Sequence, residues 1–317
     1  SLQRVEVTNL DAWYAIQFEN DKANPLTLAH HLYHNGEEVT GLHFPDGIAE
    51  INEGFFKGYE NVTSVVLPNS VKRIGDRAFS NLINLKSVTL GDSLKTIGTR
   101  AFQGCTALES IVIPNSVTTV EDRVFVGCTK LSSITLGDSV SFIGWEAFSG
   151  CDKLSKVNVT NMANFCNIEF ARHNSNGGNS NPLWIAKHLY LNDEKVTDLV
   201  IPNEVERIAN YVFAGSDIIS VSIPNSVHVI GDYAFRDCSS LTSVVIGDSV
   251  TTIGADVFWG CHELSYISIG ESLDSIAEHA FFDCDSLIVN VTKIETLFKD
   301  YKFGSWASNP FSCSIEL

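Results

Sequence analysis

Residues 101–123 read AFQGCTALESIVIPNSVTTVEDR, and the same arrangement of apolar residues returns in the 23 residues that follow. The phenylalanine of this stretch belongs to two regular series, spaced by 23 residues with one step of 22. Their members are Phe56, Phe79, Phe102, Phe125 and Phe148, then Phe213, Phe235, Phe258 and Phe281. A repeat of this length is typical of a solenoid. Apolar residues at such offsets cannot be buried within one copy, so stacked copies must form a continuous core.

Each copy contains a strand signal followed by a turn signal. The segment from Leu85 to Leu90 alternates apolar with small polar or charged residues, which is typical of a half-buried strand. One strand per copy predicts a parallel sheet. The turn that follows is Pro-Asn-Ser in some copies, as at Pro114, and Gly-Asp-Ser in others, as at Gly91. These residue types preset or permit the dihedral angles of tight turns.

This 23-residue pattern closely resembles the BspA-like, treponemal-type leucine-rich repeats, which are found largely in bacterial surface proteins and also in some protozoa. The resemblance covers most of the chain, with nine copies. It implies an α/β solenoid, a right-handed leucine-rich-repeat superhelix with a parallel β-sheet. The Leu-x-x-Val-x-Leu strands would line one face, a second extended segment (residues 94–97) would form another, and the Ala-Phe-x-x-Cys stretch would return by a short helical turn.

A second, larger motif interrupts the repeats three times, at residues 5–8, 157–160 and 289–292, where the sequence reads Val-x-Val-Thr. Amphipathic segments follow at residues 10–18, 162–170 and 294–303, and their apolar spacing predicts short helices. In the first two copies, Asn35-Gly36 and Asn192-Asp193 then predict β-hairpins. We call these inserted segments islands. Residues 172–181, rich in Asn, Ser and Gly, are predicted to form a surface loop.

The expected organisation is one continuous solenoid. A first island (residues 1–45) precedes leucine-rich repeats (46–156), and a second island (157–201) precedes further repeats (202–288). A third island starts at residues 289–317. Because the sequence stops inside that motif, we expect a fragment of a longer protein.

Charge and hydropathy exclude several kinds of partner. The chain has 38 acidic and 21 basic residues and a formal net charge of -17, which repels nucleic acid and anionic lipid headgroups. Runs of eighteen or more apolar residues are absent from the sequence, so no membrane insertion of this segment is expected. The N-terminus has no basic segment followed by an apolar run, so a signal peptide is not present in this sequence.

Six cysteines share one position, three residues after the phenylalanine. They are Cys105, Cys128, Cys151, Cys238, Cys261 and Cys284. Stacked copies would place them in a ladder with a spacing of about 4.8 Å, inside the core. Other copies carry Leu82, Tyr59 or Ser216 at this position, so bonding chemistry is not required there. We therefore predict buried structural thiols rather than disulfides or a metal site.

One tetrapeptide suggests catalysis. Gly91-Asp92-Ser93-Leu94 matches the nucleophile signature of a family of lipases and esterases, which would make Ser93 a nucleophile. That family also needs an Asp-x-x-His pair, and the sequence has none. The tetrapeptide is instead one of the repeated corners. We therefore expect no enzyme, no catalytic residue and no cofactor.

Two groups of residues have side chains that could bind a metal ion. His30 and His34 would chelate zinc only if their segment were helical, whereas a strand is expected. The corner acids Asp92, Asp138 and Asp248 could line a calcium ladder, but Asn occupies the intervening corners, and turn capping explains the acids more simply. No metal ligand is therefore predicted.

Strand alternation points some side chains away from the core, where they form a candidate partner-binding face. Its residues are Ser87, Thr89, Ser110, Val112, Ser133, Thr135, Ser243, Val245, Tyr266 and Ser268. Trp145 and Trp259, in the variable part of two copies, are expected to be exposed.

These features, with the family resemblance, predict a non-catalytic secreted or cell-surface protein, bacterial in origin. It would mediate adhesion by binding a protein, an extracellular-matrix ligand or a cell-surface ligand. The alternative is a structural spacer that carries other domains. A hydrolase using Ser93 is the least supported interpretation.

Overall fold

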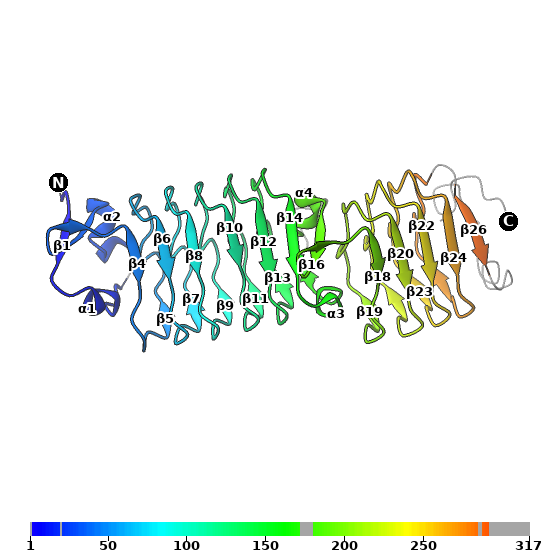
Figure 1. Cartoon of the computed structure of the whole chain (residues 1–317), viewed down its shortest axis with the longest axis horizontal. Coiled ribbons are helices and arrows are strands. Elements are labelled where there is room, and N and C mark those ends of the chain that lie inside the picture. Colours follow the sequence, from blue (N-terminus) through cyan, green and yellow to red (C-terminus); the bar gives the residue numbers. More distant parts are fainter. Residues whose placement is uncertain (1, 20, 172–179, 285–286, 292–317) are drawn as a thin grey trace. The chain divides into compact units, whose positions relative to one another are not determined.

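The computed structural model describes residues 2–19, 21–171, 180–284 and 287–291. The chain divides into two compact units. Unit 1 is Ser1–Asn158 with Ala171–Pro182, and unit 2 is Val159–Phe170 with Leu183–Leu317. In each unit the chain winds as a parallel β-solenoid, and each regular coil gives one strand to each of two sheets (Figure 1). The predicted solenoid with parallel strands is therefore confirmed.

The first sheet of unit 1 holds the strands at the position of the predicted Leu-x-Ser-Val pattern, in two hydrogen-bonded parts. One part is β4 (Gly41–His43), β6 (Ser64–Val66) and β8 (Ser87–Thr89). The other is β10 (Ser110–Val112), β12 (Ser133–Leu136) and β14 (Lys156–Val159), and β8 lies next to β10. The second sheet is made by the shorter extended segment of each coil. Its strands are β5 (Glu50–Ile51), β7 (Arg73–Ile74), β9 (Thr96–Ile97), β11 (Thr119–Val120) and β13 (Phe142–Ile143), all paired in parallel.

Unit 2 repeats this arrangement. Its first sheet consists of β18 (Asp198–Val200), β20 (Ser220–Ile223), β22 (Ser243–Ile246), β24 (Tyr266–Ile269) and β26 (Ile288–Val291). Its second sheet consists of β19 (Arg207–Ile208), β21 (Val229–Ile230), β23 (Thr252–Ile253) and β25 (Ser275–Ile276). Parallel pairing places equivalent residues of successive coils side by side, for example Ser220 beside Ser243 and Ser243 beside Tyr266.

The islands contain short helices and hairpins. The first has β1 (Val5–Val7), α1 (Leu10–Tyr14), the 3₁₀ turn η1 (Asp21–Ala23), α2 (Leu26–Ala29), β2 (Leu32–His34) and β3 (Glu37–Glu38). The second has α3 (Met162–Phe165), β15 (Glu169–Phe170), α4 (Leu183–Ala186), β16 (Leu189–Leu191) and β17 (Glu194–Lys195). The hairpins β2–β3 and β16–β17 pair antiparallel, as their turn residues predict.

The island helices are shorter than predicted. The helix expected over residues 10–18 ends at Tyr14, and the one expected over residues 162–170 ends at Phe165. In the second island the chain turns to form β15 at Glu169, which ends the helical periodicity early. The loop predicted at residues 172–181 lies outside the described residues except for its last two, and the helix predicted at residues 294–303 lies wholly outside them.

A phenylalanine ladder forms the centre of each core. All nine rings of the two series are fully buried. Phe102 stacks between Phe79 and Phe125, with ring centroids 5.4 and 5.7 Å apart and interplanar angles of 16° and 5°. In unit 2, Phe235 stacks between Phe213 and Phe258 in the same way, at 5.2 and 5.6 Å. Each 23-residue step between phenylalanines in the sequence therefore corresponds to one step along the stack of rings.

The cysteine ladder lies beside the phenylalanines. The six repeat cysteines are buried thiols, as predicted. Each thiol donates a hydrogen bond to the carbonyl of the phenylalanine in the preceding coil, as Cys128 Sγ does to Phe102 O at 3.2 Å. Burial raises the pKa of the Cys105 and Cys151 thiols to about 12, so they remain protonated at physiological pH.

The coils are also joined at their corners. The Oδ1 atoms of Asn69, Asn115 and Asn225 each accept a hydrogen bond from the backbone N–H of the Asp 23 residues later, at 2.8, 3.1 and 2.8 Å. The stretch around each buried phenylalanine is a run of turns closed by bonds such as Cys105 N to Phe102 O. Two residues before the phenylalanine the backbone has positive φ, for example 58° at Arg100, and this redirects the chain in each regular coil.

Candidate functional site

The first sheet of each unit carries the predicted partner-binding face, which we call the strand face. None of its ten residues is buried. Six are exposed, and Ser133, Thr135, Ser243 and Ser268 are half-buried. The three large side chains Val112, Val245 and Tyr266 retain 61%, 48% and 38% of their accessible surface. Parallel pairing arranges these residues in rows, because the residues that point outward from adjacent strands are in register.

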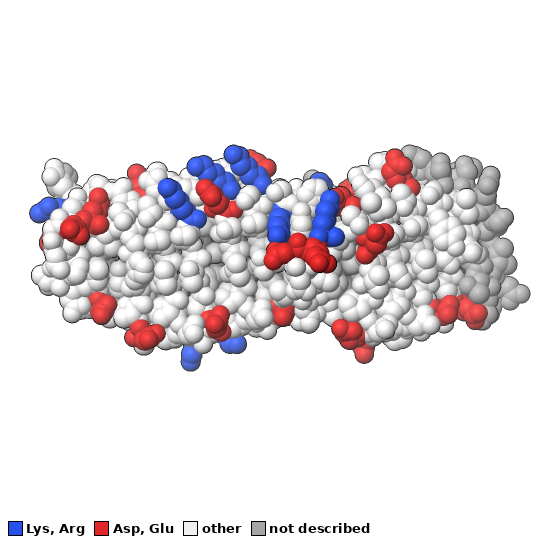
Figure 2. Space-filling view, viewed as in Figure 1, with Lys and Arg blue, Asp and Glu red and all other residues white. Residues whose placement is uncertain are grey.

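The strand face has little charge. From β6 to β12 in unit 1, the outward residues are Ser64, Val66, Ser87, Thr89, Ser110, Val112, Ser133 and Thr135. From β20 to β26 in unit 2, they are Ser220, Ser222, Ser243, Val245, Tyr266, Ser268, Ile288 and Asn290. In the view of Figure 2, the middle of unit 1 is likewise free of charged side chains, and Lys and Arg gather along one edge. Short hydroxyl and valine side chains cost less to desolvate than charged side chains do, which suits contact with another macromolecule.

Charge is distributed unequally between the two units. Unit 1 has 18 acidic and 14 basic residues, whereas residues 159–170 and 183–291 of unit 2 have 17 acidic and 4 basic residues. Most of the net charge of -17 therefore belongs to unit 2.

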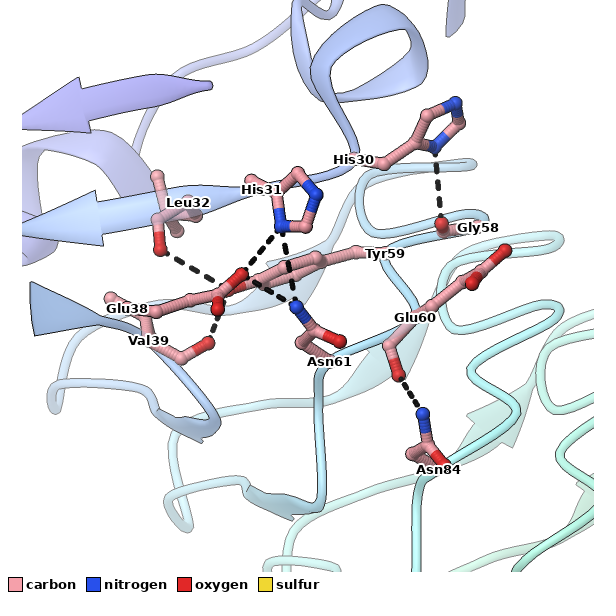
Figure 3. Close-up of polar contacts among 10 residues, drawn as sticks. All are labelled: His30, His31, Leu32, Glu38, Val39, Gly58, Tyr59, Glu60, Asn61 and Asn84. Atoms are coloured by element: carbon pink, nitrogen blue, oxygen red, sulfur yellow. Dashed lines mark hydrogen bonds and ion pairs between the residues drawn. The ribbon is translucent and has the colours of Figure 1, made fainter. Parts of the chain in front are cut away.

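A polar cluster joins the first island to the coil that follows it (Figure 3). Glu38 Oε1 lies 2.6 Å from both His31 Nδ1 and Asn61 Nδ2. Burial opposes ionisation of Glu38, but hydrogen bonds from His31 and Asn61 outweigh it and lower the pKa of this carboxyl group. The buried hydroxyl of Tyr59 lies against the backbone carbonyls of Leu32 and Val39.

The second island has a polar cluster at the equivalent positions, built from different residue types. Lys195 replaces Glu38, and its Nζ lies 2.5 Å from Asp217 Oδ2. His188 corresponds to His31, and its Nδ1 lies 2.8 Å from the same oxygen. Since the contact is retained although the residue types change, these clusters fasten the hairpins to the solenoid. The two histidines considered as zinc ligands lie on different elements. His30 ends α2, and its Nδ1 lies 3.2 Å from Gly58 O, whereas His34 lies on β2.

Ser93 lies at the corner between β8 and β9, as the repeat predicts. Within the described part of the chain, no hydrogen bond joins Ser93 to a histidine. A shallow pocket of about 230 Å³ is lined by Lys22, Thr27, His30, Lys57, Gly58 and Asn81. It is smaller than the roughly 300–1,000 Å³ of a typical small-molecule site.

Among residues 2–19, 21–171, 180–284 and 287–291, no three His, Cys, Asp or Glu side chains form a group that could hold a metal ion.

The expectation that Trp145 and Trp259 are exposed is wrong, because both are half-buried. The guanidinium of Arg123 lies 4.0 Å from the centre of the Trp145 ring, and that of Arg236 lies 4.4 Å from the centre of the Trp259 ring. Each arginine belongs to the preceding coil. Alignment of equivalent positions in successive coils, rather than inspection of each copy, would have revealed these pairs.

A model of the family described as BspA type leucine-rich repeat region (6 copies) matches residues 27–176 and 184–307. The matched residues include every phenylalanine of the two series. A search of curated proteins finds no match.

Several solved structures are similar to this chain. A leucine-rich repeat protein from Bacteroides ovatus is 24% identical, with coverage of 99% of this chain and 82% of that protein and a TM-score of 0.49. The leucine-rich repeat protein of T. pallidum is 23% identical over 71% of this chain and 78% of its own, with a TM-score of 0.38. A leucine-rich cell surface protein from Faecalibacterium prausnitzii is 21% identical, with coverages of 97% and 90% and a TM-score of 0.40.

Proposed function

Because the chain belongs to the BspA-type leucine-rich repeat family, we propose that it is a non-catalytic bacterial protein, secreted or displayed on the cell surface, that binds another macromolecule. The partner is a protein, in the extracellular matrix or on another cell, and adhesion is the result of this binding. The strand face makes the contact. Within the described residues, no helix is long and apolar enough to cross a bilayer.

One observation carries this proposal. A chain with a net charge of -17 keeps the outward side chains of β6 to β12 and of β20 to β26 uncharged. Val112, Val245 and Tyr266 are large apolar or aromatic side chains that this face leaves in solvent. A merely solvated sheet has no need to exclude charge, whereas the centre of a protein interface is depleted of charged residues.

The binding mode follows from the small size of the side chains. Ser, Thr and Val provide few strong anchors, so each coil contributes modestly and affinity comes from many coils or many molecules acting together. This mode suits a surface protein present in many copies.

The experiment introduces bulky charge into the face and measures binding to a panel of purified extracellular-matrix and cell-surface proteins. The double variant Thr135→Arg with Val245→Arg should lose binding while its circular dichroism spectrum remains unchanged. The matched control is Thr129→Arg with Ser239→Arg, since both are exposed residues directly after a repeat cysteine and off the strand face. If the wild-type chain binds none of the panel, or if the face variant binds as well as the control, the spacer interpretation replaces this one.

A further inference from the structure

The turn segment of each coil in unit 2 carries a second surface, separate from the strand face. Two positions flank the buried residues of the phenylalanine ladder: one lies two residues before the phenylalanine and the other directly after it. In unit 2 these eight positions hold the buried residues Ala214 and Asp256 and six larger, half-buried side chains, which form what we call the aromatic ladder. The aromatic ladder consists of Tyr211, Tyr233, Arg236, Trp259, His279 and Phe282.

The aromatic ladder is continuous from coil to coil. The rings of Tyr211 and Tyr233 stack with centroids 4.5 Å apart at 7°. The Arg236 guanidinium lies 5.5 Å from the Tyr233 ring centre and 4.4 Å from that of Trp259. The Trp259 ring then meets Phe282 at 5.1 Å, and His279 contacts both of those rings. Since each ring is held by its neighbours and all six side chains are half-buried, little conformational entropy remains to be lost on binding.

The backbone does not demand these residues. Tyr211 and Tyr233 have φ of 64° and 61°, a region that bulky side chains rarely occupy. Unit 1 has the same positive φ at the same position and places Arg77, Arg100 and Arg123 there. The position directly after the phenylalanine is also small or polar in unit 1, with Ser80, Gln103, Val126 and Ser149. Bulky rings at a strained position in only one unit indicate a role beyond the fold.

Acidic residues border the aromatic ladder on both sides. Asp232 and Glu278 directly precede its first position, and Asp237 and Asp283 directly follow its second. Between these coils lies Asp256, which is only 6% exposed. Its Oδ1 lies 3.5 Å from His279 Nδ1 and has no hydrogen-bond donor among the residues that the structure describes. Burial raises the pKa of Asp256, and Arg236 and His279 oppose this effect. Arg236 is neutralised by Asp237 at 3.3 Å and Asp256 at 3.6 Å, so the surface keeps a net negative charge.

We propose that the aromatic ladder of unit 2 is a docking site for a cationic, apolar-containing segment of another polypeptide. Tyr, Trp and Arg are the residues that most often dominate binding energy at protein interfaces. The aliphatic stems of the partner's Arg or Lys side chains would cover the half-buried rings, and their charged ends would reach the bordering carboxylates. The excess of 17 acidic over 4 basic residues in the described and adjoining part of unit 2 would accelerate association with such a segment.

The test uses the full chain and three fluorescent twelve-residue peptides at physiological ionic strength. The first alternates Arg with Leu, the second replaces Arg by Glu, and the third replaces Leu by Ser. The Arg/Leu peptide should bind at least tenfold more tightly than either of the others. Trp259→Ser should weaken its binding at least fivefold, whereas Val126→Ser, the equivalent position in unit 1, should leave it unchanged.

A second variant guards against local unfolding by Trp259→Ser. Glu278→Lys with Asp283→Lys leaves the rings in place and should also weaken the Arg/Leu peptide at least fivefold. The Thr135→Arg and Val245→Arg variant of the strand face should bind this peptide normally, which separates this site from the proposed adhesion face. If no peptide binds, if the Glu/Leu or Arg/Ser peptide binds as tightly, or if both ladder variants retain full affinity, the docking site is wrong.

Discussion

Replacement of Phe102 by alanine should cost close to the largest amount that a single core truncation can cost. The ring has no exposed surface and is stacked on both sides, at 5.4 Å from Phe79 and 5.7 Å from Phe125. A buried Phe→Ala change typically costs about 3–5 kcal/mol, and two stacked ring pairs place this one near the upper end. By contrast, Thr89→Ala on the exposed strand face should cost about 0.5 kcal/mol or less.

Urea unfolding measures the size of this effect, and native-state hydrogen exchange shows where it acts. Because a coil contacts mainly the coils next to it, protection should fall most around Phe79, Phe102 and Phe125 and little around Phe258. The reasoning is refuted if Phe102→Ala and Thr89→Ala cost the same, since the assignment of inward and outward positions would then be incorrect. An even loss of protection over both units would instead contradict the nearest-neighbour picture.

Three further predictions concern single interactions. Burial raises the folded pKa of Cys105 and Cys151 to about 12, so their contribution to stability should be intact below about pH 8.5. This contribution should fall as pH rises towards 12, by up to about 1.4 kcal/mol per pH unit for each thiol. Cys151→Ala should make this alkaline decline shallower in pH-dependent urea unfolding, and an unchanged slope would show that the thiol titrates normally. Asn115→Ala, which removes the acceptor for Asp138 N, should cost about 1 kcal/mol by the same method, and no loss would mean that water replaces the side chain. In an ester hydrolysis assay, both the wild-type protein and the folded Ser93→Ala variant should be inactive. Esterase activity of the wild type that is lost on substitution would restore the hydrolase hypothesis.

The sequence predicted the features that depend on burial. A ring required in the core at every coil appears as a phenylalanine every 23 residues, so the stacking of Phe102 and its neighbours could be inferred from spacing alone. The free thiols could be inferred because Leu82 and Ser216 occupy the cysteine position in other coils. The outward orientation of Val112 and Val245 followed from strand alternation. The partner-binding role of these residues stays a prediction.

The missed features depend on backbone dihedrals or on contacts between coils. Positive φ at Arg100 or Tyr233 could not be anticipated, because neither residue type favours that conformation and the periodicity of apolar residues carries no dihedral information. The contact between Arg236 and Trp259 joins residues in different coils. Each looks like an isolated variable position within its own copy. The helices α2 and α4 were missed because four residues are too few to show a helical period.

The ladder of free thiols has a consequence for biosynthesis. Adjacent rungs of a parallel sheet are about 4.8 Å apart, a separation at which two cysteines can be cross-linked. In the folded protein Cys105 and Cys151 are protected, because oxidation requires a thiolate and burial suppresses the thiolate of both residues. An unfolded chain has no such protection. A chain exported to an oxidising compartment must therefore fold before its cysteines are oxidised, and the solenoid then keeps Cys105 and Cys151 reduced.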